Sequence, residues 1–411
     1  MNPDYVKILR CPNSGCTRSE KEPLRGSLHL INARFKDGLI RTGTLKCSTC
    51  GEEFPIKSGF SNLLPERIRK CLEGEPSEEK LTPYDKEILN GIRWSGRMVP
   101  SYHANVVDPF TSALGARYIE RYEDLYIDNM LNKYIKNRKM KVIFIEMGVG
   151  TGRYLIRYGS RLLNNEVTFK EKIFIKPFKR PLLKSKVCQA YREDSILRKY
   201  YSYDIDYDQN LQLLIGIDFQ ESMIEKCIDN LREMKLHSLF GKRILLSVGT
   251  AQYFNLALDQ IDEFKNSFRV VTCVFQTLGN QKEKLQIDLL KTLHRLASPQ
   301  GIIVVSVFNK ERFSEFGLES FYKYEVAPTV GEMRDDSEAL ELRRKGILVT
   351  RQGVYSQWFS KEDLKKVFNA AGLNVTLKSY DQLGPFGDTN YIGGKKQEEV
   401  RKTLIIAESE V

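Results

Sequence analysis

The segment Glu146-Met147-Gly148-Val149-Gly150-Thr151-Gly152-Arg153 decides how this chain folds. An apolar run, residues 141–146, precedes it, and a helical pattern follows it. Glycine permits a sharp turn and lets the backbone approach a ligand closely. The N–H groups at the start of a helix attract negative or polar ligand groups. The segment therefore predicts a strand, a ligand-binding loop and a helix in direct succession.

Four further apolar runs downstream predict a parallel sheet. They are rich in Val, Ile and Leu and occupy residues 211–218, 243–248, 269–275 and 301–308. Near-continuous apolar strands are typical of parallel sheets that helices cover on both faces. Apolar side chains recur at helical spacing between these runs, within residues 221–234 and 283–297.

The C-terminal part predicts one more helix and two more strands. Ser360 is a candidate N-cap with Asp363 three residues later, and Gly372 ends the helical pattern. Strands are expected at residues 374–379 and 403–408. Together these elements predict an α/β fold, a Rossmann-like seven-stranded sheet with helices on both faces.

An acid ends the second apolar run. Asp218 is suited to hold the two hydroxyls of a ribose through charge-assisted hydrogen bonds. The glycines follow a Gly-x-Gly-x-Gly spacing, which differs from the Gly-x-Gly-x-x-Gly of dinucleotide-binding folds. The Gly-Lys-Ser/Thr ending of phosphate-binding loops is absent, which argues against an ATPase.

These motifs resemble the class I S-adenosylmethionine-dependent methyltransferase superfamily. The acid Glu146 and the three alternating glycines match its first motif, and Gly216-Ile217-Asp218-Phe219 matches its second. Gly249-Thr250-Ala251 stands where the family has Gly-Asp-Ala, so Thr250 replaces an aspartate. The resemblance implies that S-adenosylmethionine is the cofactor, with its ribose at Asp218 and its adenine against Phe219.

The resemblance also implies a full set of donor-binding residues. They are Glu146, Gly148, Gly150, Gly152, Asp218, Phe219, Thr250, Ala251 and Gln276. Gln276 follows the fourth strand, on the side that faces the methyl donor. It is expected to cap the strand or contact the methionine part of the donor, or alternatively to orient the acceptor. No residue is assigned a catalytic role.

Two cysteine pairs near the N-terminus predict a structural metal site. Cys11 and Cys16 form the first pair, and Cys47 and Cys50, followed by Gly51, form the second. Four thiolates suit tetrahedral zinc and leave no open coordination position, so the expected role is structural. Zinc would also supply folding energy that such a short segment does not easily gain from burial.

The rest of this segment resembles the small zinc-binding activator proteins of tRNA methyltransferases. The resemblance rests on Phe54-Pro55-Ile56 and Leu63-Leu64-Pro65, with Gly59-Phe60-Ser61 in place of Gly-Ile-Pro. It implies a zinc ribbon that could dock a protein partner. A non-catalytic adaptor or activator that uses this ribbon is therefore the alternative to an enzyme.

Charge and hydropathy restrict the choice of partner. The net charge is +11 and the pI about 9.1, which fits a polyanionic partner such as RNA or simply a solvated basic surface. No stretch reaches the ~20 apolar residues that a membrane span needs, and no signal peptide is evident at the start of the chain. A cytoplasmic location is expected.

Two insertions point to different methyl acceptors. The first, residues 160–205, is rich in basic and aromatic residues, which suit RNA. The second, residues 309–355, is placed where a lid would enclose a small molecule. RNA is slightly favoured. The expected units are a zinc ribbon at 1–66, a linker and helical cover at 67–140, and a methyltransferase domain at 141–411.

Overall fold

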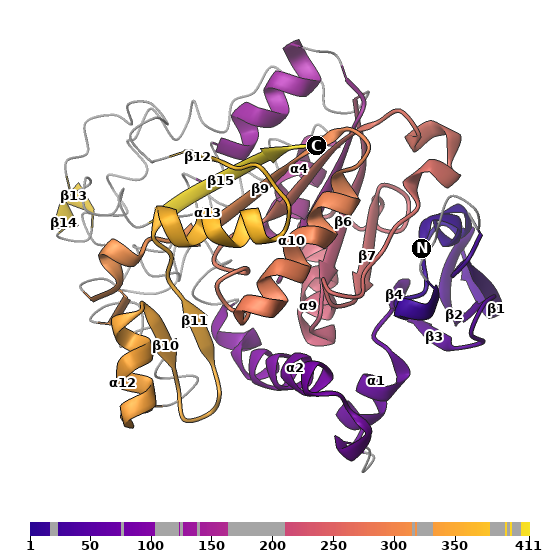
Figure 1. Cartoon of the computed structure of the whole chain (residues 1–411). Helices are drawn as coiled ribbons and strands as arrows, with labels where there is room; N and C mark the ends of the chain where they lie inside the picture. The colour runs from indigo at the N-terminus through magenta and orange to yellow at the C-terminus, as the bar shows by residue number, and fades with distance from the viewer. Residues whose placement is uncertain are drawn as a thin grey trace, which may run out of the picture.

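The centre of the molecule is one large mixed sheet. In the computed structural model this sheet has eleven strands in the order β1-β2-β3-β4-β7-β6-β5-β8-β9-β15-β12 (Figure 1). The structure describes residues 1–16, 24–74, 78–102, 123, 126–137, 140–162, 210–314, 317–318, 332–378, 391–392, 395–396 and 404–411.

Five parallel strands form the middle of the sheet, and every residue in them is buried. They are β5 (Val142–Met147), β6 (Leu211–Asp218), β7 (Ile244–Val248), β8 (Phe268–Cys273) and β9 (Gly301–Phe308). Each coincides with a predicted apolar run to within two residues. From β5 the sheet grows first to one side, with β6 and β7, and then to the other side, with β8 and β9. This order confirms the Rossmann-like α/β fold.

Two antiparallel strands complete one side of the sheet. Strand β15 (Leu404–Glu410) pairs with β9, and β12 (Thr376–Lys378) pairs with β15. Both were predicted from the sequence. Their addition to the five parallel strands gives the seven strands that were expected.

The predicted total of seven strands is nevertheless wrong, because the N-terminal segment extends the same sheet. Strands β1 (Leu28–Lys36), β2 (Leu39–Cys47), β3 (Glu53–Lys57) and β4 (Phe60–Asn62) form an antiparallel meander. Strand β4 then pairs in parallel with β7, with Ser61 opposite Ser247. Hydrophobic periodicity identifies strands but does not reveal which edges meet, and pairing satisfies the backbone groups that β7 would otherwise leave open.

Helices cover both faces of the sheet, as predicted. Helices α4 (Arg153–Leu162) and α9 (Glu221–Glu233) pack in one hydrophobic cluster, and α10 (Glu283–Ala297) and α13 (Lys361–Ala370) pack mainly in another. Val142 and Phe144 of β5 belong to the first cluster, whereas Ile143 and Ile145 belong to the second. This alternation is the two-residue period of a strand that is buried on both faces. Ser360 and Asp363 form the predicted capping box of α13.

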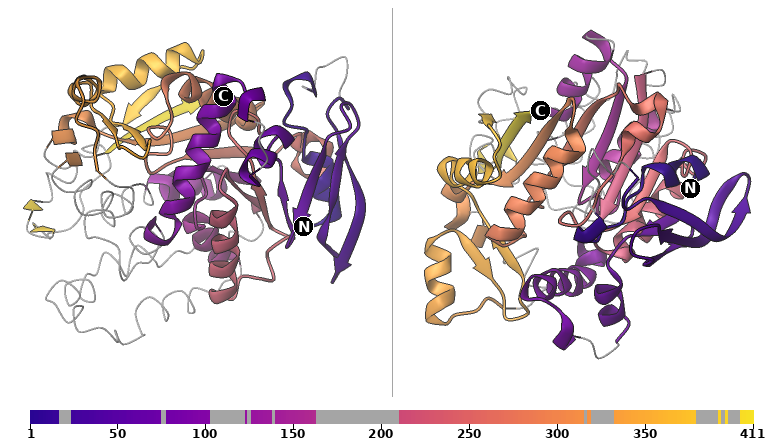
Figure 2. Two further views of the ribbon diagram at one scale, coloured as in Figure 1. Left: turned by 90° about the horizontal axis from the view of Figure 1, so that it is seen from below. Right: turned by 45° about the vertical axis from the view of Figure 1, so that its right-hand side comes forward.

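The stretch predicted as a linker and helical cover, residues 67–140, contains packed helices in its described parts. Helix α1 (Glu66–Leu72) buries Ile68 and Cys71, and α2 (Pro83–Tyr102) lies next to α1 and α9 (Figure 1). Residues 126–132 are helical and continue into a π-helical turn, Lys133–Asn137. The views in Figure 2 place the N-terminal strands at one side of the molecule and α13 at the other.

The remaining elements are short. Part of the second insertion forms α12 (Ser337–Arg344) and a hairpin of β10 (Ile347–Val349) and β11 (Tyr355–Gln357). Two strands of two residues each, β13 (Tyr391–Ile392) and β14 (Lys395–Lys396), pair with each other and precede β15 in the sequence. The described residues also form 3-10 turns at Pro3–Ile8, Ser14–Cys16, Glu78–Lys80, Leu258–Gln260, Asp262–Phe264 and Lys310–Arg312. Among the described helices, none has the length and apolarity to cross a bilayer.

Candidate functional site

The loop after β5 is shaped by positions that only glycine can fill. Gly148 has a φ of +81°, and a Cβ added there would lie 2.7 Å from Cγ2 of Thr277. A Cβ added to Gly152, at φ +94°, would lie 2.4 Å from the Sγ of Cys227. The Gly148 N–H donates to the Ile217 carbonyl at 2.8 Å, which ties the loop to the end of β6. The loop therefore lies flat across two neighbouring strand ends.

Asp218 lies directly beside this loop. Its Oδ2 accepts a hydrogen bond from the Gly150 N–H at 2.9 Å, and its Oδ1 accepts one from the Gln220 N–H at 2.9 Å. Burial raises the pKa of Asp218 to about 6, although these backbone donors act in the opposite direction. The carboxylate at the end of β6 and the glycine loop at the end of β5 thus form one site.

A pocket of about 470 Å³ of empty space, part of it open to solvent, lies where these strand ends meet. Its walls come from the carboxyl ends of four parallel strands, from α2, from α10 and from the loop before α10. The lining residues are Glu87, Ile88, Gly91, Met147, Gly148, Ile217, Asp218, Phe219, Gly249, Thr250, Ala251, Gln252, Thr277, Gln281 and Leu289. The carboxyl ends of parallel strands beside a change in strand order are where open α/β sheets bind ligands.

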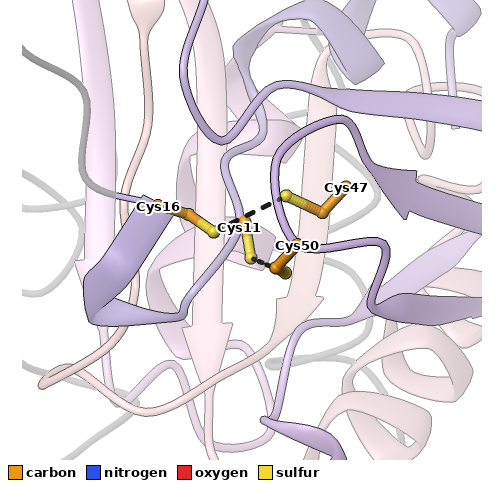
Figure 3. A group of neighbouring side chains, drawn as sticks. All are labelled: Cys11, Cys16, Cys47 and Cys50. Carbon is orange, nitrogen blue, oxygen red and sulfur yellow. Dashed lines mark hydrogen bonds between the residues drawn. The ribbon is translucent and has the colours of Figure 1, made fainter.

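The four predicted metal ligands come together at the N-terminal end of the chain. The Sγ atoms of Cys11, Cys16, Cys47 and Cys50 all lie within 4.8 Å of one another. The Sγ atoms of Cys11 and Cys50 are 3.8 Å apart, and those of Cys16 and Cys47 are also 3.8 Å apart (Figure 3). Sulfur atoms at such separations can surround one ion of the size of zinc.

The environment of these thiols favours a cation. Burial and nearby thiols raise the pKa of Cys16 to about 12, and burial raises that of Cys11 above its usual range. Four thiolates at this spacing would repel one another, and a divalent ion removes that repulsion. The Thr49 N–H approaches the Cys47 Sγ at 3.3 Å, which adds a backbone donor of the kind that stabilises a ligating thiolate.

Comparison with known proteins identifies the family. A family model described as a methyltransferase domain matches residues 118–378, well over half of the chain. The chain belongs to this methyltransferase family. It is an S-adenosylmethionine-dependent enzyme, and the non-catalytic adaptor gains no support. No curated protein matches it.

Solved methyltransferase structures resemble this methyltransferase distantly. CcbJ from Streptomyces caelestis shares 13% identity and a TM-score of 0.37, with 70% of this chain and 93% of that chain covered. An S-adenosylmethionine-dependent methyltransferase from Clostridium acetobutylicum shares 10%, with a TM-score of 0.35 and coverages of 71% and 92%. CalS10 from Micromonospora echinaspora, an amino pentose methyltransferase, shares 10%, with a TM-score of 0.32 and the same coverages.

Five of the nine predicted donor-site residues line the pocket of this methyltransferase: Gly148, Asp218, Phe219, Thr250 and Ala251. Thr250 stands where the family pattern has an acid. Its hydroxyl is buried and has no hydrogen-bond partner among the described residues. A buried polar atom in a pocket wall is suited to a ligand, because it otherwise loses its hydrogen bond to water.

Three of the other predicted residues, Glu146, Gly150 and Gly152, are absent from the pocket lining among the described residues. Glu146 is buried at the end of β5, and Gly150 donates its N–H to Asp218. Gly152 packs against α9 through Cys227. Gly150 therefore positions Asp218, and Gly152 fits the loop against α9.

Gln276 connects strands instead of facing the pocket. Its Nε2 donates to the Gln357 carbonyl at 2.6 Å, and its Oε1 accepts from the Phe308 N–H at 2.7 Å. It is buried and has a φ of +66°. Of the three roles predicted for Gln276, this geometry matches that of a residue that caps a strand. Its neighbour Thr277 lines the pocket.

Glu123 is a buried residue that no motif in the sequence indicated. Its carboxylate accepts from the Phe275 N–H at 3.0 Å and pairs with Arg153 at 2.5 Å. Burial raises its pKa, although Arg153 opposes the shift. It therefore joins the first residue of α4 to the turn after β8, which leads into Thr277.

Helix α2 supplies a pocket wall that the sequence motifs did not indicate. Glu87, Ile88 and Gly91 face the pocket from this helix. Glu87 also forms an ion pair with Lys282 at 2.5 Å, which links α2 to the loop before α10. The sequence predicted a linker and helical cover within residues 67–140, but that prediction does not say which surface a helix covers.

Proposed function

We propose that the pocket holds S-adenosylmethionine with its ribose at Asp218. The observation that carries the proposal is the buried Asp218 carboxylate, which lines the pocket and accepts the Gly150 N–H of the glycine loop. Its acceptor capacity is not exhausted by two backbone donors, so it can also accept from a sugar diol. Phe219 would lie against the adenine, and Thr250 would offer the adenine its hydroxyl.

The bound donor supplies an electrophilic methyl group on a sulfonium. The chain contributes binding, orientation and the exclusion of water. Met147, Ile217 and Leu289 make part of the wall apolar, and α2 covers it with Ile88. The acids Glu87 and Asp218 give the wall negative charge, which suits a cationic donor.

The four cysteines are proposed to hold one structural zinc. The donor set is complete with Cys11, Cys16, Cys47 and Cys50, so no position remains for a substrate or a water nucleophile. The ion would fix the two loops that carry the cysteines. Its role in the enzyme would therefore be to fold the N-terminal strands against β7.

RNA is the methyl acceptor that we favour. The net charge of +11 suits a polyanion. A small acceptor would need an enclosing lid, and none of the described residues within 309–355 lines the donor pocket. The basic insertion, residues 160–205, which also favours RNA in the sequence, lies almost wholly outside the described residues.

Calorimetry with S-adenosylmethionine tests the donor site. The wild-type chain should bind at one site, and Asp218→Asn should raise the Kd at least about tenfold, because hydrogen bonds to charged groups contribute about 1.5–3 kcal/mol. Asp229→Asn is the matched control, since Asp229 is an exposed acid on α9 that pairs with Arg232. Equal donor affinity in wild type and Asp218→Asn would refute the assignment.

A methyl-transfer assay tests the acceptor. Tritium from labelled S-adenosylmethionine should enter total RNA and disappear from the macromolecular fraction after ribonuclease treatment. A parallel reaction with a small-molecule extract is the competing arm. Label that survives ribonuclease, or that appears only in the extract, would exclude RNA. Asp218→Asn gives the enzyme-dependent background.

A further inference from the structure

We propose that Asp85 is a positioning residue that couples the four-cysteine metal centre to the donor pocket. The proposal rests on the donor and zinc sites proposed above. It adds that metal binding at the four-cysteine centre controls the affinity of the donor pocket for S-adenosylmethionine. Three sets of contacts carry it: the hydrogen bonds to Asp85 itself, the link from Asp85 through Tyr253 and α2 to the pocket walls, and the contacts of α1 with the cysteine loops.

Asp85 is a buried carboxylate with an unusually full set of donors. Its side chain is 2% exposed. Arg67 donates to it twice, through Nε and Nη2, each at 3.0 Å. The hydroxyls of Thr82 and Tyr253 each donate to it at 2.8 Å. A two-pronged arginine contact with further hydroxyl donors is strong and geometrically specific.

These contacts keep Asp85 ionised. Burial alone would raise its pKa, but the hydrogen bonds from Arg67, Thr82 and Tyr253 lower the pKa below its usual value. The guanidinium of Arg67 also lies over the Tyr253 ring, 5.4 Å from its centroid. Arg67, Asp85 and Tyr253 therefore form one packed polar unit.

On the pocket side, this unit joins two walls. Asp85 lies two residues before Glu87 on α2, and Glu87 and Ile88 line the pocket. Tyr253 directly follows Gln252, which lines the pocket from the loop after β7. A single carboxylate thus holds α2 against the loop that carries Thr250.

On the metal side, the same unit reaches the cysteine loops through α1. The Glu66 N–H, at the first turn of α1, donates to Glu52 Oε1 at 2.5 Å, and Glu52 lies two residues after Cys50. Asn13 provides a second connection. Its Nδ2 is 3.5 Å from the Cys50 Sγ, and its Oδ1 accepts from Arg67 Nη1 at 3.4 Å.

Metal binding therefore has a physical route to the donor pocket. A bound ion fixes the loops that carry the cysteines, which fix α1 through Glu52 and Asn13. Helix α1 presents Arg67 to Asp85, and Asp85 holds the two walls together. Coupling between two binding sites is reciprocal, so the donor should also raise the equilibrium affinity for the metal.

A cycle of donor affinities in the full-length chain tests this coupling. The Kd for S-adenosylmethionine is measured by calorimetry with zinc bound and after chelation under reducing conditions, in wild type and in Asp85→Asn. Chelation should raise the wild-type Kd about tenfold, a typical size for coupled sites. Asp85→Asn with zinc should show a similar rise, and chelation should add less than about twofold to it. Asp229→Asn should behave like wild type.

Variants on the route guard against a simple loss of folding. Asn13→Ala and Arg67→Lys keep all four cysteines, and Arg67→Lys cannot donate twice to Asp85. Both should raise the KM for the donor several-fold and leave kcat at saturating donor within about twofold, because the route acts on donor binding. Thermal unfolding should still be cooperative in both.

Several results would overturn the coupling. The first is a wild-type Kd for the donor that does not change on chelation. The second is a Kd in chelated Asp85→Asn that rises by the full product of the two separate effects. The third is a kcat in Asn13→Ala or Arg67→Lys that falls in proportion to the rise in KM. If the wild-type chain binds the donor and any of these results is found, the coupling is refuted and the proposed donor site is not. Wild type that binds no donor, or no zinc, refutes the corresponding proposed site as well.

Discussion

The carboxylate of Asp218 lies in a buried position, where burial disfavours its ionised form. The carboxylate is buried, yet it accepts two backbone N–H groups and lines the pocket. Desolvation prevails in the chain without ligand and raises the pKa of Asp218 from 3.8 to about 6. A ligand that donates two hydroxyls would offset this cost, because it replaces the water that the site excludes.

Donor affinity should therefore depend on the protonation of Asp218. The ionised carboxylate accepts stronger hydrogen bonds than the acid, so the Kd for S-adenosylmethionine should fall as the pH rises from 5 to 7, through the pKa of about 6. Calorimetry across this range measures the effect. Asp218→Asn should flatten the profile, and an unchanged profile in that variant would assign the dependence to another group.

The same shift predicts an opposite trend for the stability of the unliganded chain. The folded state retains the Asp218 proton between the unfolded pKa of 3.8 and the folded pKa of about 6. The contribution of this residue to the free energy of unfolding is then largest below the unfolded pKa and falls as pH rises through the window. Urea unfolding of wild type against Asp218→Asn, at pH 4 and 7, measures this contribution. A contribution that grows with pH would contradict the assignment.

Gly148→Ala should weaken donor binding through contact with Thr277. A Cβ at Gly148 would lie 2.7 Å from that side chain, which lines the pocket. Gly353→Ala is the matched control, since Gly353 has a φ of +86° and no atom within 4 Å of an added Cβ. Each variant should lose about 1 kcal/mol of stability from backbone strain. Only Gly148→Ala should raise the donor Kd in calorimetry; an equal effect of the control would show that strain alone is responsible.

At the scale of elements, buried ion pairs fix the helical residues 126–132 to α4. Asp128 pairs with Arg157 and with Arg161, the latter at 3.0 Å, and Tyr158 donates to it at 3.0 Å. Burial raises its pKa, but the two arginines outweigh this and hold the pKa of Asp128 well below its usual range. This segment precedes β5, so its placement orders the chain just before the glycine loop.

Asp128→Asn should destabilise the chain strongly. It removes the negative charge that Arg157 and Arg161 both contact, and breaking a buried pair typically costs about 3–5 kcal/mol. Asp229→Asn removes an exposed pair on α9 and should cost less than about 1 kcal/mol. Urea unfolding at pH 7 compares the two. A loss in Asp128→Asn no greater than in Asp229→Asn would show that the cluster contributes little.

At the scale of the whole molecule, the N-terminal strands and the methyltransferase sheet are one body. The Ser61 and Ser247 hydroxyls meet at 2.9 Å between β4 and β7, and the Ala257 N–H donates to the Ile8 carbonyl at 2.8 Å. Ile8 and Phe254 also share a hydrophobic cluster with Ile145 of β5. Loss of the N-terminal fold would therefore expose core residues of the enzyme.

Loss of zinc should lower the unfolding temperature of the whole chain. Cys47→Ser removes one ligand and should reduce the zinc content below the single ion per chain that four cysteines can hold. Scanning calorimetry should show one transition, shifted down by several degrees, because the two parts share a sheet. Cys71→Ser, a buried cysteine outside the cluster, should keep the zinc. Two separate transitions would show that the N-terminal strands fold independently of the rest of the sheet.

The sequence by itself determined the five parallel strands, the helices between them, and the turn at Gly148 to Gly152. These follow from local chemistry. Short apolar runs rich in Val and Ile favour buried strands, and glycine tolerates the positive φ that the turn adopts. The sequence also singled out the four cysteines and Asp218, because few residue types can hold a metal ion or a sugar diol. The structure brings the four Sγ atoms together and places Asp218 in the pocket wall, and the ligands of both sites stay predictions.

Only the tertiary structure decided how distant segments meet. The pairing of β4 with β7, the pocket wall from α2, and the contacts of Asp85 with Arg67 and Tyr253 join residues far apart in the chain. The strand-linking role of Gln276 also depends on Gln357, eighty-one residues later. Hydrophobic periodicity indicates which side of a helix or strand is buried. It does not indicate which element that side packs against, because the packing partner depends on the fold of the whole molecule.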